Sequence, residues 1–270
     1  MDTKSTSIIG VVVLGILVAG GVLWYMSEHP APVTFQHGGT GIGTSTEQTL
    51  PQKIEEHAKY YDIVASSPSS TSLKATAGAQ ADAQAVEVMK QFVTTSVAGF
   101  KDRGNFANLT AKDLEMMGFN QGRKEAFEVT YTTQAGPRSV SYIFTLFEDT
   151  FGAHPNTYYR TFTFDTKTGE GLELADLFTP GTDYLSVLSK ISRDKLPSQL
   201  AKASNAPVSS IDMDYLKRGT SADSDNFTTW FIQGNNLVLK FPPYQVAAYV
   251  FGSPELAIPL SSLPIKALYK

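Results

Sequence analysis

The chain has no cysteine among its 270 residues. This absence excludes disulfides, thiolate metal sites and a cysteine nucleophile. The net charge is −4, and Lys and Arg form no cluster dense enough to follow a phosphate backbone, so nucleic acid is not an expected partner. Ordinary fractions of apolar (42%) and aromatic (11%) residues nevertheless predict a folded core. Stability must therefore come from packing.

Motifs for catalysis and cofactor binding are missing as well. The sequence contains no G-x-S-x-G nucleophile elbow, no H-E-x-x-H and no EF-hand loop. "HGGTGIGT" has the composition of a phosphate-binding loop but lacks G-K-[ST]. We therefore expect no catalytic residue, no metal and no cofactor, and a protein that is not an enzyme. An acidic patch could attract calcium, but without a closing glutamate a solvated loop is favoured: Asp212, Asp214, Asp223 and Asp225.

One long apolar run stands near the N-terminus. Residues 8–26, "IIGVVVLGILVAGGVLWYM", carry no charge, and a helix rising ~1.5 Å per residue would cross a ~30 Å hydrocarbon core with such a run. Trp24 and Tyr25 are of the type that favours the membrane interface. A cleaved signal peptide is the alternative, although its apolar region is usually only ~7 to 15 residues long. We expect an uncleaved transmembrane helix.

The flanking sequence predicts orientation and organisation. Lys4 and the α-amino group precede the run, which favours a cytoplasmic N-terminus and an extracytoplasmic body in a single-pass protein of the cell membrane. The segment after the run is rich in Pro, Gly and small polar residues, which predicts a flexible stalk. The expected organisation is a head at 1–7, a span at 8–26, a stalk at 27–54 and a body from 55 onward.

The body combines two hydrophobic periods. Apolar residues at spacings of three and four predict a helix over residues 81–101. Period-two alternation near residues 127–131, 140–146 and 158–164 predicts three strands, and their short connections favour antiparallel pairing. The expected fold class is α+β, an antiparallel sheet with helices packed on one face. Asp165, in "FDTKTG", is expected to fix a turn rather than to act as an acid.

His154 is the most conspicuous candidate for chemistry. It precedes Pro155 in "FEDTFGAHPNT", and a residue before proline favours extended backbone, so the histidine belongs to a defined loop. Glu148 or Asp149 could orient its ring, which would give half of a nucleophilic triad. Because no nucleophile elbow accompanies it, we favour a histidine that fixes its loop by hydrogen-bonding the backbone.

Ordered motifs link the second half of the body to a known family. They are G-A-H-P-N, F-D-x-x-T-G, L-x-D-L-F, P-Y-x-x-A-x-Y-x-x-G and I-P-x-x-x-L. In this order they resemble the RsiV-like C-terminal domain, also called domain of unknown function 3298, which we place at residues 142–270. The preceding residues 55–141 resemble the companion domain in the N-terminal region of the peptidoglycan deacetylase PdaC. The family usually has two glycines before A-H-P, and Phe151 replaces the first.

The resemblance implies an extracytoplasmic module of the bacterial cell envelope. We therefore expect a membrane-anchored binding or sensing protein that recognises a cell-wall component such as peptidoglycan, or a wall-degrading enzyme such as lysozyme. The alternative is an envelope hydrolase that uses the His154 loop. Because loops on a rigid scaffold carry recognition, the candidate binding residues lie in two loop segments, although the three aromatic ones could instead close the core: His154, Asn156, Tyr244, Tyr249 and Phe251.

Overall fold

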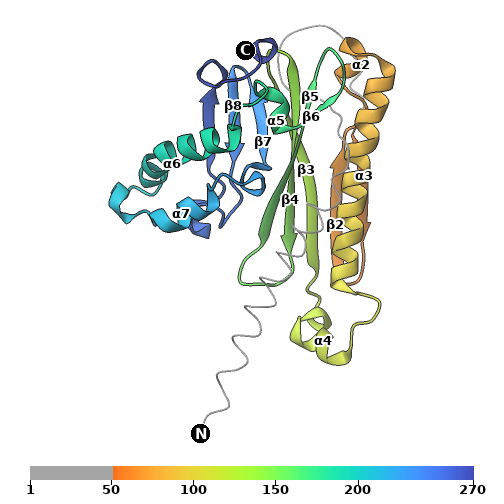
Figure 1. Cartoon of the computed structure of the whole chain (residues 1–270). Coiled ribbons are helices and arrows are strands. Elements are labelled where there is room, and N and C mark those ends of the chain that lie inside the picture. The colour runs from red at the N-terminus through yellow and green to blue at the C-terminus, as the bar shows by residue number, and fades with distance from the viewer. Residues whose placement is uncertain (1–50) are drawn as a thin grey trace. The chain divides into compact units, whose positions relative to one another are not determined.

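The computed structural model describes residues 51–270. Its strands form a six-stranded sheet, in the order β1-β2-β3-β4-β5-β6, and a three-stranded sheet, β7-β8-β9 (Figure 1). The expected head, the expected span at 8–26 and the stalk up to residue 50 lie outside the described residues. Within residues 51–270, none of the helices combines the length and the apolar character needed to cross a bilayer.

Pairing in the larger sheet is antiparallel at every neighbour except one. β3, β4 and β5 pair antiparallel as predicted, with Val129 opposite Leu146. β2 and β3 pair in parallel, with Tyr61 opposite Glu125, because a helix crosses over between them. The expectation of an antiparallel sheet is therefore wrong for this pair. The strands are β1 (Gln52–His57), β2 (Tyr61–Ser67), β3 (Glu125–Ala135), β4 (Ser139–Asp149), β5 (Asn156–Asp165) and β6 (Gly171–Leu172).

Two boundaries differ from those expected. β1 begins at Gln52, which pairs with Ser67, so the last residues assigned to the stalk belong to an edge strand. The expected division at residue 142 lies inside β4. The regions 55–141 and 142–270 therefore share one sheet.

The crossover helix α3 (Ala79–Gly104) covers one face of the six-stranded sheet (Figure 1). Phe92 packs edge-on against Phe144 and Phe162, with ring centroids 5.4 and 5.5 Å apart, and Phe100 stacks on Phe127 at 5.0 Å. The predicted helix is confirmed and extends a few residues further at both ends. α2 (Leu73–Thr76) precedes it, and α4 (Ala111–Met116), which begins with a capping box between Thr110 and Asp113, follows it.

The three-stranded sheet covers the opposite face, and it does so with its edge. It comprises β7 (Trp230–Gln233), β8 (Asn236–Lys240) and β9 (Glu255–Pro259). Ile232 N–H, on the edge strand β7, donates to Ser141 Oγ at 3.1 Å, and Trp230 N–H donates to Thr161 Oγ1 at 3.3 Å. Side-chain hydroxyls of β4 and β5 thus satisfy backbone donors of β7. The expected arrangement, with helices on one face only, omitted this second layer.

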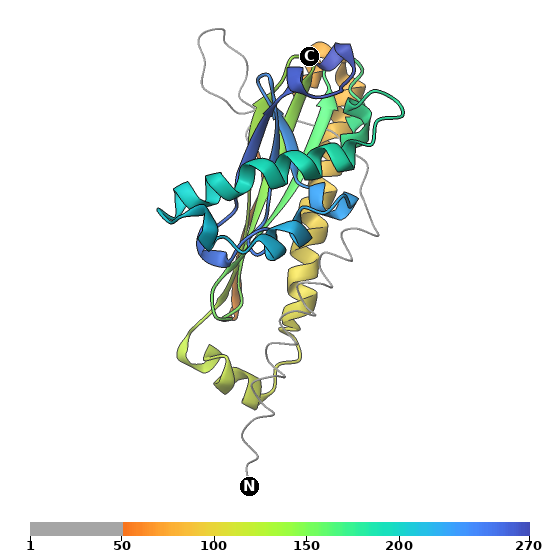
Figure 2. The ribbon, with the colours of Figure 1, turned by 60° about the vertical axis from the view of Figure 1, so that its left-hand side comes forward.

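Helices α5 (Leu174–Leu177), α6 (Tyr184–Ala203) and α7 (Met213–Gly219) complete a second core with β7 to β9. Figure 2 shows α6 running across the direction of the strands. Leu188 and Leu196 of α6 are fully buried, and Asp183 caps the helix by accepting from Ser186 N–H at 3.1 Å. The short 3-10 helices are η1 (Phe119–Gln121), η2 (Val208–Ser210), η3 (Ser224–Phe227), η4 (Tyr249–Phe251), η5 (Leu260–Ser262) and η6 (Ala267–Tyr269).

Aspartates singled out in the sequence have structural tasks. Asp212 caps α7 by accepting from Tyr215 N–H at 2.9 Å, and Asp223 caps η3. Asp165 Oδ1 accepts from Lys167 N–H at 2.7 Å, which confirms the predicted turn, and its Oδ2 accepts from Arg138 Nε at 2.6 Å. Burial would raise the pKa of Asp165, but the guanidinium and the turn amides outweigh it and hold that pKa below its usual value.

Candidate functional site

The loop between β4 and β5 is held in a strained conformation. Phe151 has a φ of 61°, a left-handed value that favours glycine and that falls at the position where the family resemblance expects one. The strain is countered by contacts on both sides of the residue. Asp149 Oδ1 accepts from Phe151 N–H at 3.1 Å, and the guanidinium of Arg123 lies 3.8 Å from the centre of the Phe151 ring. These two contacts hold the loop in a defined conformation.

Both ring nitrogens of His154 are engaged within the protein. Nδ1 lies 2.9 Å from the carbonyl oxygen of Pro155, and since a carbonyl only accepts, Nδ1 carries the hydrogen. In the neutral imidazole, Nε2 then accepts from the Tyr244 hydroxyl at 2.7 Å. The imidazole also stacks on Tyr249 at 3.8 Å, with the ring planes 19° apart. The prediction that His154 fixes its loop through a backbone hydrogen bond is confirmed.

Three of the predicted binding residues meet at one exposed surface. We call His154, Tyr244 and Tyr249 the aromatic face. Tyr244 is 49% exposed and Tyr249 36%, and their ring centroids lie 5.6 Å apart. Val250, which follows, is 85% exposed. Such a surface offers flat apolar rings with hydroxyl groups at their edges, which suits stacking against a sugar ring or insertion into a pocket of a protein partner.

The segment that carries Tyr244 is anchored by α7. Tyr244 has a φ of 68°, and the Tyr215 hydroxyl donates to its backbone carbonyl. The Gln245 side-chain amide donates to the carbonyls of Gly219 at 3.0 Å and Asn226 at 2.8 Å. Tyr215 and Gln245 are supports that sequence reasoning missed. Gln245, a polar residue directly after Tyr244 in the P-Y-x-x-A motif, was a usable signal, whereas nothing in the short α7 segment marks Tyr215.

Asn156 and Phe251 do not join the aromatic face. Asn156 begins β5 opposite Glu148 and is partly buried. Phe251 packs against the second core. For Phe251 the alternative interpretation, that the aromatic residue closes the core, describes its position.

Neither carboxylate upstream of His154 orients its ring. Glu148 accepts from Arg103 Nη2 through both oxygens, at 2.9 and 3.0 Å, and Asp149 binds the loop amide of Phe151. The acid–histidine pair, the interpretation not favoured from the sequence, does not form, because α3 and the loop backbone engage both carboxylates. Within residues 51–270, no hydrogen bond of His154 reaches a serine or a threonine.

A second group of titratable residues lies where α3 ends against the sheet. Glu125, at the start of β3, is only 5% exposed. Burial above all, with the charges of Glu148 and Asp149, raises the pKa of Glu125 from 4.5 to about 7, although the nearby Arg103 acts in the opposite direction. Tyr158 is subject to the same influences: burial raises its pKa, as does the Glu148 charge. Arg103 pairs with Glu148 and not with Glu125. Ionisation of the buried Glu125 carboxyl is therefore unfavourable in the folded protein.

Comparison with known proteins gives two partial relatives. "Peptidoglycan-N-acetylmuramic acid deacetylase PdaC" of Bacillus subtilis is 32% identical over 126 residues, which are 47% of this chain and 26% of that protein. The esterase Rv3036c of Mycobacterium tuberculosis is 24% identical over 128 residues, which are 47% of this chain and 52% of that protein. The matched stretch thus spans about a quarter of the first relative and about half of the second.

Solved structures and family comparison extend the likeness. A DUF3298 family member from Bacteroides fragilis superposes with a TM-score of 0.53 at 16% identity, covering 79% of this chain and 90% of that one; it shares the fold. The family described as "Protein of unknown function (DUF3298)" matches residues 175–261, which run from α5 to η5. The resemblance proposed from the ordered motifs is confirmed, with a shorter matched range than expected. Residues 175–261 thus match the DUF3298 family.

Proposed function

We propose that the protein is a membrane-anchored binding or sensing module outside the cytoplasm of a bacterial cell, and that the aromatic face contacts its ligand. The geometry of His154 carries the proposal. Both ring nitrogens hold intramolecular hydrogen bonds, while Tyr244 and Tyr249 remain open to solvent. A general base needs a nitrogen within reach of the proton it removes, whereas recognition needs exposed rings held rigidly, and this site provides the second.

The glycan strand of peptidoglycan is the favoured ligand. Sugar rings present flat apolar faces that stack on tyrosine, and the similarity to a peptidoglycan deacetylase supports a setting in the cell envelope. The apolar run at residues 8–26 supports the membrane anchor. Lysozyme is the other partner that the family resemblance suggests. A net charge of −4 would assist its encounter with such a basic protein, in a salt-dependent manner.

Removing either exposed tyrosine should weaken binding to peptidoglycan. We expect Tyr244→Ala and Tyr249→Ala each to lower the affinity of the full chain for insoluble peptidoglycan about tenfold, the loss of one well-packed aromatic contact. Tyr249→Phe, which keeps the ring, should retain most of the affinity. Met116→Ala is the matched control, because Met116 is 68% exposed on helix α4 and is not part of the aromatic face. Co-sedimentation across a salt series measures all four variants.

The outcomes separate the partners. Wild-type binding to lysozyme without binding to peptidoglycan would replace the glycan by a protein ligand. Binding to neither at low salt would overturn the proposal, and so would peptidoglycan binding that both alanine variants retain in full.

An envelope hydrolase is the second candidate, and the similarity to an esterase favours it. The binding proposal leads us to expect no ester hydrolysis that depends on His154. Turnover of p-nitrophenyl acetate by the full chain should therefore be the same for the wild type and His154→Gln. Circular dichroism of the variant would verify that it is folded. Turnover that the wild type supports and the folded variant loses would make the hydrolase the better assignment.

A further inference from the structure

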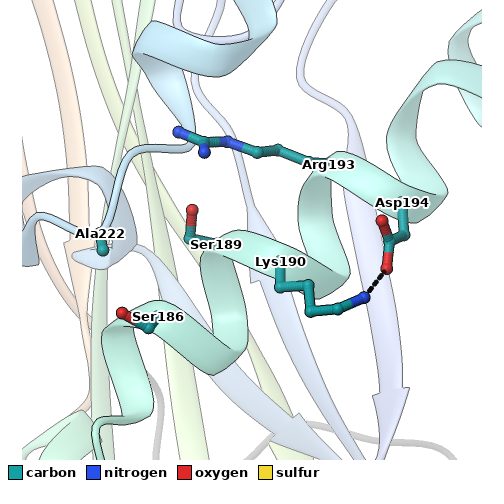
Figure 3. A pocket seen from close by; sticks show the side chains of 6 residues that line it. All are labelled: Ser186, Ser189, Lys190, Arg193, Asp194 and Ala222. Carbon is teal, nitrogen blue, oxygen red and sulfur yellow. Dashed lines mark hydrogen bonds and ion pairs between the residues drawn. The ribbon is translucent and has the colours of Figure 1, made fainter.

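A polar pocket lies beside α6, away from the residues of the aromatic face. Its volume is about 360 Å³, at the small end of the range for ligand pockets. Five of its residues recur at helical spacing on α6, and a sixth comes from the loop before η3 (Figure 3). The lining residues are Ser186, Ser189, Lys190, Arg193, Asp194 and Ala222.

Arg193 is held in place before any ligand arrives. Its Nη2 donates to the carbonyl of Lys217 at 2.9 Å, and its Nε donates to Thr220 Oγ1 at 3.3 Å. A guanidinium has five N–H donors, so three remain. Because α7 and the residue that follows it already fix the side chain, little conformational entropy is lost when a ligand uses those donors.

Ser189 supplies a hydroxyl beside this guanidinium. The residue is 5% exposed, and it lines the pocket. Figure 3 shows the hydroxyl on the same side of α6 as Arg193, whereas Lys190 extends away toward Asp194. A serine hydroxyl that lines the pocket can donate one hydrogen bond to an oxygen of a ligand.

The local charge favours a singly charged oxyanion. Lys190 and Arg193 contribute +2 and Asp194 contributes −1, which leaves +1, and Lys190 Nζ pairs with Asp194 Oδ2 at 2.6 Å. The unpaired cation is thus Arg193, whose planar fork matches the two oxygens of a carboxylate. We propose that this pocket binds the carboxylate group of a small polar molecule. The inference is independent of the aromatic face and would survive its failure.

N-acetylmuramic acid is a suitable probe, because it is a sugar with one carboxylate and N-acetylglucosamine is its counterpart without one. We expect titration calorimetry with the full chain to detect N-acetylmuramic acid, and to give at least about tenfold weaker binding of N-acetylglucosamine, the effect of losing a charge-assisted pair. Arg193→Gln should cause a similar loss, and Ser189→Ala a loss of several-fold to about tenfold. Lys195→Gln removes a positive charge elsewhere on α6 and should change nothing.

Arg193 also supports α7, so Ser189→Ala and a second variant guard against a folding effect. Ala222→Phe leaves the Arg193 contacts intact and should block the pocket. Equal binding of the two sugars, or full binding by Ser189→Ala and Ala222→Phe together, would overturn the proposal. Inorganic phosphate that binds as tightly, and only when Arg193 is present, would overturn the assignment to a carboxylate. Tyr249→Ala should leave this binding unchanged, which separates the pocket from the aromatic face.

Discussion

Glu125→Gln should stabilise the protein at pH 8 by about 2 to 3 kcal/mol. The raised pKa of about 7 for Glu125, against 4.5 in its usual state, means that the ionised carboxylate is disfavoured in the folded protein. Each pKa step corresponds to about 1.4 kcal/mol, so the full difference is about 3 kcal/mol. Glutamine keeps the shape of the side chain and removes the charge that faces Glu148 and Asp149.

The sign of the pH dependence follows from proton binding. Below pH 4.5 both the folded and the unfolded states hold the Glu125 proton. Between 4.5 and about 7 the unfolded state releases it first, so the contribution of Glu125 to stability falls as pH rises, and it stays constant above that range. The stabilisation by Glu125→Gln should therefore be small at pH 4.5 and complete near pH 8.

Urea unfolding of both proteins between pH 4.5 and 8 measures this difference. Glu128→Gln is the matched control, because Glu128 lies on the same strand with its side chain exposed. An advantage of Glu125→Gln that does not grow with pH would show that Glu125 does not hold its proton in the folded state.

Gly219→Ala should destabilise the protein by about 2 kcal/mol or more. A Cβ built on Gly219 would lie 1.8 Å from the backbone oxygen of Gln245. The backbone of Gln245 cannot move away freely, because its side-chain amide donates hydrogen bonds to the carbonyls of both Gly219 and Asn226. Alanine is favoured over glycine in a helix by only about 1 kcal/mol. The clash should therefore outweigh the gain in helix propensity.

The same substitution should disturb the aromatic face, because Tyr244 directly precedes Gln245. We expect a lower thermal midpoint and weaker peptidoglycan binding together. Gly99→Ala makes the same chemical change inside α3, where the nearest atom outside the helix backbone is the end of the Arg103 side chain at 3.3 Å. The stability of Gly99→Ala should lie within about 1 kcal/mol of that of the wild type, or be higher. Equal stability of Gly219→Ala and the wild type would show that α7 and Gln245 do not pack this closely.

The strands β3 to β5 could be predicted because their alternation marks one buried face. β1 could not be predicted, because its sequence, "QKIEEH", is mostly charged and its side chains are mostly exposed at the edge of the sheet. The parallel pairing of β2 with β3 depends on where α3 crosses, which local periodicity does not encode. The position of β7 could not be predicted either. Its side chains are typical of a strand, but no local sequence feature predicts that its edge contacts hydroxyls of β4 and β5.

The candidate site shows the same division. His154 and Tyr244 were each candidates from their loop context, yet 90 positions separate them and only the fold shows that they share a hydrogen bond. Glu148 and Asp149 are the opposite case, since their closeness to His154 in the sequence made a contact conceivable that Arg103 and the Phe151 amide prevent. The helical spacing of the polar residues on α6 could be recognised in the sequence, but a stripe of serine and lysine usually marks a solvated face.

The hydrogen bonds that β7 donates to β4 and β5 limit where the chain can be cut into fragments. Its amide hydrogens at Trp230 and Ile232 are satisfied by Thr161 and Ser141, which lie outside residues 175–261. A fragment cut at those limits would present a bare strand edge, the kind of surface through which protein copies associate and aggregate. In the intact chain the same two amides should exchange with deuterium as slowly as the β4 core. The limits of the DUF3298 match therefore leave out the two strands whose hydroxyls satisfy β7 in the intact chain.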